Sequence, residues 1–381
     1  MTRAEPVRRR RGPRRGKNIH RLARRILTAR ARSIAKHANS IQETHMETPI
    51  QAEMRPRNNR TNVRISALGA ILRAAERTWP WLGERLALAT FRKPRRTVLP
   101  LSGPAGEPKL RWFDVGGIQC AMYIWRSETR NERTRRKPVL LVHGWGDSGL
   151  RLRNFVPALL ALGHDVIAFD AIGHGRSGGR RSDVGRIAST IAALNKRYHG
   201  FDRVIAHSAG SAATMIAAAW RELPIEHAVL LSTPASAAER VREFVRCFGL
   251  GERTRIYMLD YLFRHIGAPA DEEGWLGYIE GVTARTKVYH DPEDRILPYR
   301  EAEALRDRLP NVQLHPAKGL GHFRLLNDRA VIEGAVAHLH AEAQPAPHTA
   351  TQSAEVHPHV RPREPRNASN DRFDNAIALA S

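Results

Sequence analysis

The 381-residue sequence has few cysteines and no long apolar run. Its two cysteines, Cys120 and Cys247, are far apart, which excludes a disulfide framework and a metal-ligand spacing. We therefore expect a reducing compartment and a cytoplasmic protein. No apolar run approaches the roughly 18 residues that a membrane span requires. The charged N-terminus also lacks the apolar stretch of a secretory signal peptide.

Acidic residues are outnumbered, since 38 Asp and Glu stand against 62 Lys and Arg, for a formal net charge of +24. Residues 1–60 contain 17 of the basic residues and four Glu, so they carry more than half of this net charge. Such a charged segment with few core-forming residues predicts a basic, disordered leader. It could attract nucleic acid or an anionic membrane. The simpler interpretation is a solvated tail, or translation from Met46 or Met54, and no specific nucleic-acid partner is expected.

The next segment, residues 61–107, is predicted to be helical. Ile65, Leu68 and Leu72 recur at helical spacing, and tryptophan and leucine continue the apolar content. An amphipathic helix could rest on a membrane surface, so peripheral contact through residues 1–92 stays open. We favour packing on the domain that follows, because the apolar side of an amphipathic helix usually faces a core.

From residue 108 to residue 342, short apolar stretches alternate with helical ones. Near-continuous apolar runs such as KPVLLVHG and HAVLLST are typical of strands that are buried on both faces. We therefore predict an α/β domain with a doubly wound, mostly parallel sheet of eight strands. The predicted strands are KLRWFDVGG, IQCAMYIWR, KPVLLVHG, HDVIAFD, RVIAHS, HAVLLST, TKVYHD and VQLHP.

One connection in this domain is unusually long. Residues 234–284 separate two predicted strands, and an ordinary connection is far shorter. They include the helical patterns ERVREFVRCFGL and RIYMLDYLFRHIG, so we predict an inserted helical cap. Residues 343–381 are rich in Pro, His, Ala and Asn and are predicted to form a disordered tail.

A serine lies between a predicted strand and a predicted helix in FDRVIAHSAGSAATMIAAAW, residues 201–220. Ala206 and Gly210 stand two residues before and after Ser208, and a sharp strand-to-helix turn requires small residues there. Such a turn projects the hydroxyl from the fold, and the helix N-terminus favours negative charge. Ser208 is therefore a candidate nucleophile, provided that a base removes its proton. The alternative is an ordinary helix N-cap.

Candidates for the base and for the acid that orients it follow two later strands. Asp294 comes after TKVYHD and His322 after VQLHP, which gives the chain order Ser, Asp, His. Asp294 would accept the Nδ1–H of His322, so that Nε2 could take the proton of Ser208. Asp291 is the rival acid. The alternatives are a turn aspartate and a surface-loop histidine.

Two Gly-rich loops also follow predicted strands, VLLVHGWGDSG at 139–149 and FDAIGHGRSGG at 169–179. Together with AHSAGS and the ordered pair Asp294 and His322, they resemble the α/β-hydrolase superfamily. AHSAGS is similar to the nucleophile elbow G-x-S-x-G, with alanine in place of the first glycine. The resemblance covers residues 108–342 and is to the branch of esterases, lipases and serine-aminopeptidase-like enzymes. A serine nucleophile argues against the dehalogenase and epoxide-hydrolase branches.

The resemblance implies roles for further residues. The backbone N–H groups of Trp145, after His-Gly, and of Ala209 would form the oxyanion hole. Asp294 is preferred to Asp291, because Ile-Leu-Pro follows it as in the family. The resemblance also implies a lid, and residues 234–284 match it in position.

Other polar residues of these loops are interpreted as structural. His143 would hold its loop by hydrogen bonds, while His174 and Ser177 lie in a loop that stands aside from the triad in this fold. GHGRSGG also resembles G-x-G-x-x-G, but no strand-loop-helix unit with a ribose-binding acid supports a nucleotide site.

The implied activity is hydrolysis of a small-molecule carboxylic ester through an acyl-enzyme on Ser208, with no metal or organic cofactor. Apolar side chains in the predicted cap favour an apolar acyl group. The same triad would also serve an acyltransferase, a thioesterase or an amidase. A catalytically silent hydrolase fold that acts as a binding protein is a further alternative. The sequence predicts no oligomeric state.

Overall fold

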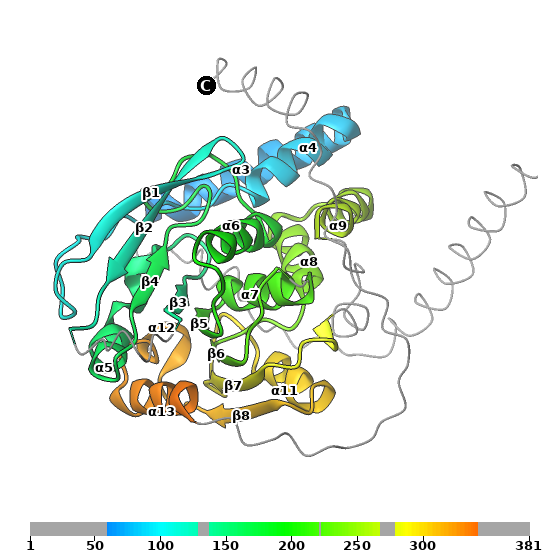
Figure 1. The fold of residues 1–381 in the computed structure, drawn as a ribbon. Coiled ribbons are helices and arrows are strands. Elements are labelled where there is room, and N and C mark those ends of the chain that lie inside the picture. The colour runs from blue at the N-terminus through cyan, green and yellow to red at the C-terminus, as the bar shows by residue number, and fades with distance from the viewer. Residues whose placement is uncertain (1–58, 129–136, 221, 267–278, 342–381) are drawn as a thin grey trace, which may run out of the picture. The chain divides into compact units, whose positions relative to one another are not determined.

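The computed structural model describes residues 59–128, 137–220, 222–266 and 279–341 (Figure 1). The predicted tail, nearly all of the predicted leader and part of the predicted cap lie outside the described residues. An eight-stranded sheet forms the centre of the described structure. Its strands are β1 (Lys109–Val115), β2 (Ile118–Trp125), β3 (Val139–Val142), β4 (Val166–Phe169), β5 (Arg203–His207), β6 (His227–Leu231), β7 (Arg285–His290) and β8 (Val312–Pro316).

The sheet has the strand order β1-β2-β4-β3-β5-β6-β7-β8. β2 is antiparallel to both β1 and β4, and all other neighbouring strands are parallel. The prediction of a doubly wound, mostly parallel sheet of eight strands is confirmed. The strand order reverses at β3, which has β4 on one side and β5 on the other. Open α/β sheets bind ligands at such a point, beyond the carboxyl ends of the strands.

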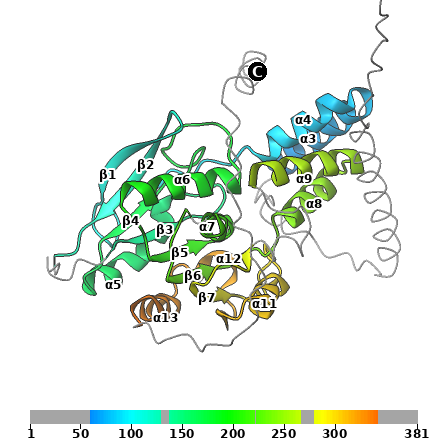
Figure 2. The same ribbon diagram turned by 45° about the vertical axis from the view of Figure 1, so that its right-hand side comes forward.

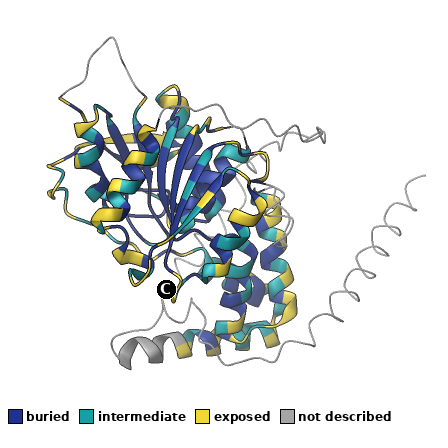
Figure 3. Cartoon of the chain, turned by 90° about the horizontal axis from the view of Figure 1, so that it is seen from below, coloured by how far each residue is buried: buried dark blue, intermediate teal, exposed yellow. Residues whose placement is uncertain are grey.

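Helices cover both faces of the sheet, and this burial explains the continuous apolar strands. In β3, Leu140 and Val142 belong to one apolar cluster, whereas Val139 and Leu141 belong to the other. Figure 3 shows the buried strands between helices whose outer surfaces are exposed. One face carries α6 (Val184–Arg197) and α7 (Ala209–Ala219), and the other carries the 3-10 helix Gly149–Phe155, α5 (Val156–Ala161) and α13 (Arg329–His340).

Four more helices pack together beside this core, as Figure 2 shows. The phenyl rings of Phe91 in α4 and Phe244 in α8 meet edge to face at 5.4 Å, and Arg253 in α9 pairs with Glu84 in α4. The first helical segment therefore packs against the insertion between β6 and β7. The helices are α3 (Asn59–Thr78), α4 (Pro80–Phe91), α8 (Ala237–Phe248) and α9 (Glu252–Ile266).

The first helical segment is divided in two at Trp79. Pro80 is the first residue of α4. Proline is favoured at that position, because it needs no hydrogen-bond acceptor for its nitrogen and its φ suits a helix. Within the described ranges, no helix is both long enough and apolar enough to cross a membrane.

Candidate active site

Ser208 stands at a strained turn between β5 and α7. Its φ of 52° and ψ of −125° lie in a region that side chains rarely adopt. Gly210 lies in the first turn of the helix, against the end of β3, and a Cβ there would lie 2.8 Å from the carbonyl oxygen of Val142 and closer still to that of His143. The need for a small residue after the serine is therefore steric. Ser208 occupies the N-cap position, but its side chain makes no capping bond to the described N–H groups of α7.

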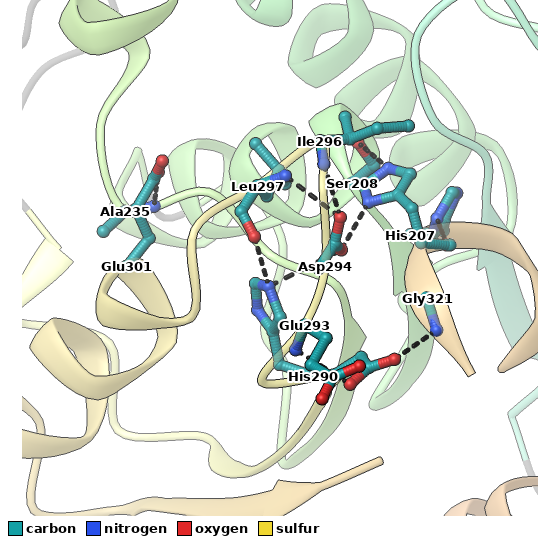
Figure 4. A network of polar contacts seen from close by, with 12 residues as sticks. His207, Ser208, Ala235, His290, Glu293, Asp294, Ile296, Leu297, Glu301 and Gly321 are labelled. Atoms are coloured by element: carbon teal, nitrogen blue, oxygen red, sulfur yellow. Dashed lines mark hydrogen bonds and ion pairs between the residues drawn. The ribbon is translucent and has the colours of Figure 1, made fainter. Parts of the chain in front are cut away.

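The hydroxyl of Ser208 instead contacts the imidazole of His322, which in turn contacts Asp294. Figure 4 shows Ser208 and Asp294 in this network. His322 Nε2 lies 3.1 Å from Ser208 Oγ, and His322 Nδ1 lies 2.8 Å from Asp294 Oδ2. The three side chains come from the segments that follow β5, β7 and β8, and His322 lies in the short helix α12 (Gly321–Arg324). They form one continuous hydrogen-bonded row in the order acid, imidazole and hydroxyl.

The environment of Asp294 favours its ionised form. Burial would raise the pKa of this carboxyl, but the hydrogen bond and charge of His322 lower it, as do the N–H groups of Ile296 and Leu297, to about 2. Those two N–H groups donate to Oδ1 at 2.8 and 3.1 Å. An ionised Asp294 only accepts, so Nδ1 of His322 carries a proton, and in the neutral form of the ring Nε2 presents its lone pair to Ser208.

Asp291, the rival acid, has a different set of contacts. Its Oδ1 accepts from the N–H of Glu293 at 3.0 Å, and its Oδ2 accepts from the N–H of Gly321. Gly321 directly precedes His322, and Asp291 is buried. Asp294, and not Asp291, contacts the imidazole, while Asp291 holds the backbone of the same loop.

The two candidate oxyanion donors lie beside Ser208. Ala209 is the first residue of α7, where backbone N–H groups lack a partner within the helix. The loop after β3 touches the elbow at Gly144, where a Cβ would lie 3.1 Å from the Cβ of Ser208. Trp145 follows, half-buried, with its ring edge-on to that of His174 at 5.2 Å. Ala209 and the loop of Trp145 thus lie next to Ser208, and their role as oxyanion donors stays a prediction.

The three residues interpreted as structural contact backbone groups. His143 Nε2 accepts from the N–H of Ala171 at 3.0 Å, so its Nδ1–H donates to the carbonyl oxygen of Gly144 at 2.7 Å. His174 Nδ1 lies 3.0 Å from the carbonyl oxygen of Ile172. Ser177 is also buried, and its hydroxyl accepts a backbone N–H of β2. These contacts join the loops to one another.

Sequence reasoning did not single out Asp170, although it lies in the quoted stretch FDAIGHGRSGG. This buried carboxylate accepts from the hydroxyl groups of Tyr123 and Ser148 at 2.6 and 2.7 Å. It also accepts from the backbone N–H groups of Gly149 and Arg176 at 2.8 and 2.7 Å. Asp170 therefore ties the loop after β4 to the start of the 3-10 helix that follows the oxyanion loop.

Other reactive groups lie apart from this row. Cys120 and Cys247 are free thiols, and burial raises the pKa of both, that of Cys120 to about 11. They are therefore protonated and weakly nucleophilic at neutral pH. The described part of the chain holds no group of three or more His, Cys, Asp or Glu placed to bind a metal ion.

A family model described as the alpha/beta hydrolase fold matches residues 137–248. The match runs from β3 to α8 and includes the elbow and both Gly-rich loops. This match and the eight-stranded, mostly parallel sheet identify the fold as that of the α/β-hydrolases.

Solved structures of hydrolases are also similar to this chain. Est1E from Butyrivibrio proteoclasticus, determined with ferulic acid bound, is 19% identical over 60% of this chain and 98% of its own, with a TM-score of 0.48. The esterase Pf2001 of Pyrococcus furiosus is 20% identical over 65% of this chain and 98% of its own, with a TM-score of 0.47. A thioesterase domain from the curacin biosynthetic pathway is 16% identical over 61% and 100%, with a TM-score of 0.45.

Proposed function

We propose that this protein is a serine hydrolase that cleaves carboxylic esters through an acyl-enzyme on Ser208. The observation that carries the proposal is the row from Asp294 through His322 to Ser208, with contacts of 2.8 and 3.1 Å. An N-cap serine would bond to its own helix, whereas this hydroxyl lies 3.1 Å from His322 Nε2. That arrangement activates a hydroxyl that is otherwise a poor nucleophile.

In the acylation step, Ser208 Oγ attacks the carbonyl carbon of the ester while its proton moves to His322 Nε2. Asp294 stabilises the resulting imidazolium through Nδ1. The N–H groups of Trp145 and Ala209 would bind the negative oxygen of the tetrahedral intermediate. When this intermediate collapses, the bond to the alcohol oxygen breaks and His322 returns the proton to that oxygen.

In the deacylation step, water takes the place of the alcohol. His322 removes a proton from the water, and the hydroxide oxygen bonds to the acyl carbon. The second tetrahedral intermediate releases Ser208 Oγ, which regains its proton from His322. The products are the free carboxylic acid and the unmodified serine, so no oxidant or metal is required by this balance.

The preference for an apolar acyl group was inferred from apolar residues of the predicted cap. Among the described ones, Phe244, Phe248 and Leu262 are buried, and the first two lie ring to ring at 4.7 Å. Packing between helices accounts for these three side chains without a substrate, and Trp275 and Tyr278 lie outside the described residues. Nitrophenyl esters of increasing acyl length test the preference, since equal rates on short and long chains would remove it.

The activity itself is tested by labelling with a fluorescent fluorophosphonate, which reacts with activated serines. Wild type is compared with Ser208→Ala and with Ser189→Ala, a control serine on α6. We expect labelling of wild type and of the control, and none of Ser208→Ala. A folded wild type without labelling would overturn the proposal and favour a binding protein with a silent triad.

Labelling alone does not separate an esterase from enzymes that use the same triad. Turnover of matched oxygen esters, thioesters and anilides, with and without an added alcohol acceptor, makes that separation. We expect the oxygen ester to react fastest and water to be the acceptor. A faster thioester or anilide, or transfer to the alcohol, would replace the esterase by a thioesterase, an amidase or an acyltransferase.

A further inference from the structure

The imidazole next to the nucleophile is buried and bonded to the loop of the candidate base. His207 is the last residue of β5, directly before Ser208, and its relative exposure is 1%. Its Nε2 lies 3.0 Å from the carbonyl oxygen of His322. A carbonyl oxygen only accepts, so Nε2 carries the proton and donates it. His207 thereby joins the elbow to the backbone of the residue that would take the proton of Ser208.

The His207 ring also approaches the oxyanion loop at Gly144. It further contacts the rings of His322 and Phe323 in the segment after β8 that carries His322, which we call the base loop. A Cβ at Gly144 would lie 2.9 Å from His207 Nδ1, so no larger residue fits there without displacing the ring. The His207 ring is 4.8 Å from that of His322 and 5.7 Å from that of Phe323. Three loops of the candidate site therefore meet at one side chain.

His207 is held in its uncharged form. Burial and, secondarily, the neighbouring His322 lower its pKa well below the ordinary value of a histidine. The charge state matters because His322 becomes a cation during the proposed reaction, and a second cation at this distance would oppose it. A neutral His207 can donate its hydrogen bond without that repulsion.

Two of the hydrogen bonds that hold the segment of His322 join it to different parts of the site. Asp291 accepts the N–H of Gly321, and His207 donates to the carbonyl oxygen of His322. The bond from Asp291 anchors the base loop to the loop after β7, which also carries Asp294. The bond from His207 comes from the residue directly before Ser208, so it bears directly on the contact between Ser208 Oγ and His322 Nε2.

We propose that His207 is a positioning residue for the proposed reaction, which holds the base loop through its Nε2–H so that His322 Nε2 stays within reach of Ser208 Oγ. The inference rests on the proposed function, because it requires Ser208 and His322 to act as a pair. According to this proposal, His207 acts through its hydrogen bond to the carbonyl oxygen of His322 and not only through the volume of its ring. A purely space-filling role would be served equally by an apolar side chain of similar length.

The test compares His207→Gln, whose amide nitrogen can reach the place of Nε2, with His207→Met, which has similar length and no donor. For each we would measure kcat and KM on a nitrophenyl ester and the rate of fluorophosphonate labelling. Misplacing a reacting group by about 1 Å can cost on the order of 100-fold in rate. We expect His207→Met to lose about 10- to 100-fold in kcat and labelling with KM nearly unchanged, and His207→Gln to recover most of that loss.

His338→Met is the matched control. Its imidazole Nε2 makes the same kind of bond, at 3.0 Å, to the carbonyl oxygen of Arg285 far from the triad, and we expect unchanged rates. Wild-type rates in His207→Met, or equal losses in both His207 variants, would overturn the positioning role. If His207→Met does not fold, His207→Asn, whose amide is too short to reach, replaces it beside His207→Gln, with the same expectations. An unlabelled wild type would instead overturn the proposed function, and this inference with it.

Discussion

Position 210 admits only glycine, because the first turn of α7 runs against the end of β3. The carbonyl oxygens of Val142 and His143 occupy the space that a side chain would need. We expect Gly210→Ala to lower the free energy of unfolding by about 1–3 kcal/mol, since neither strand nor helix can move away. Urea unfolding measures this. Gly69→Ala is the control, since its Cβ would meet chiefly the end of the flexible Arg73 side chain, and a loss equal to that of Gly210→Ala would contradict the steric explanation.

The two acids of the loop after β7 have separable roles at the same scale. Asp294→Asn removes the carboxylate that fixes the tautomer of His322, and we expect kcat to fall by about 1,000-fold or more. Asp291→Asn keeps an oxygen that can accept the Gly321 N–H, so we expect a loss of roughly tenfold or less. Ester turnover of both variants is the measurement. The reverse ranking would show that Asp291, and not Asp294, orients the base.

At the scale of elements, one arginine joins α8 to α11 (Tyr299–Arg308) and to the loop of Asp294. Arg240 Nη1 lies 2.9 Å from Glu243 Oε2, and the same guanidinium pairs with Glu301. Nη1 also donates to the carbonyl oxygen of Ile296, at 3.5 Å. Two buried carboxylates therefore share one cation, which leaves an excess of negative charge inside the protein.

The burial of Glu243 predicts that stability depends on pH. Burial raises the pKa of Glu243 to about 7, against an unperturbed value of 4.5, even though Arg240 opposes the shift. Between these values the folded protein binds a proton that the unfolded chain has released, so stability falls as the pH rises from 4.5 to above 7. The size of this contribution is about 3 kcal/mol. Urea unfolding at pH 5 and pH 8 should show a smaller loss in Glu243→Gln, and identical losses would contradict the prediction.

At the scale of the whole molecule, the basic leader and the candidate active site are predicted to be separate parts of the chain. The candidate site residues fall between Trp145 and His322, whereas residues 1–53 hold 14 Lys and Arg and four Glu. We expect deletion of residues 1–53 to leave fluorophosphonate labelling unchanged, and to weaken salt-dependent binding to DNA, RNA or anionic vesicles. Unchanged binding would retire the idea of a basic tether. Reduced labelling would contradict the separation.

Much of the fold could be predicted because its strands are buried on both faces. Each continuous apolar run, such as VLLV at 139–142, marks a strand without reference to its neighbours. The strand order could not be predicted from those runs, since parallel neighbours are joined by helices and leave no local signal. The division at Trp79 was also missed, although Pro80 is a local signal for a helix start.

By itself, the sequence determined the chemical groups and their chain order: a serine in a tight turn, then an acid, then a histidine. Local sterics and apolar patterns are sufficient for that, because they act over a few residues. Only the tertiary structure shows that Asp294, and not Asp291, contacts His322, and only it joins His207 to His322, residues 115 apart in the chain. Contacts across such distances depend on how the strands associate, and sheet packing has no short-range signature in the sequence.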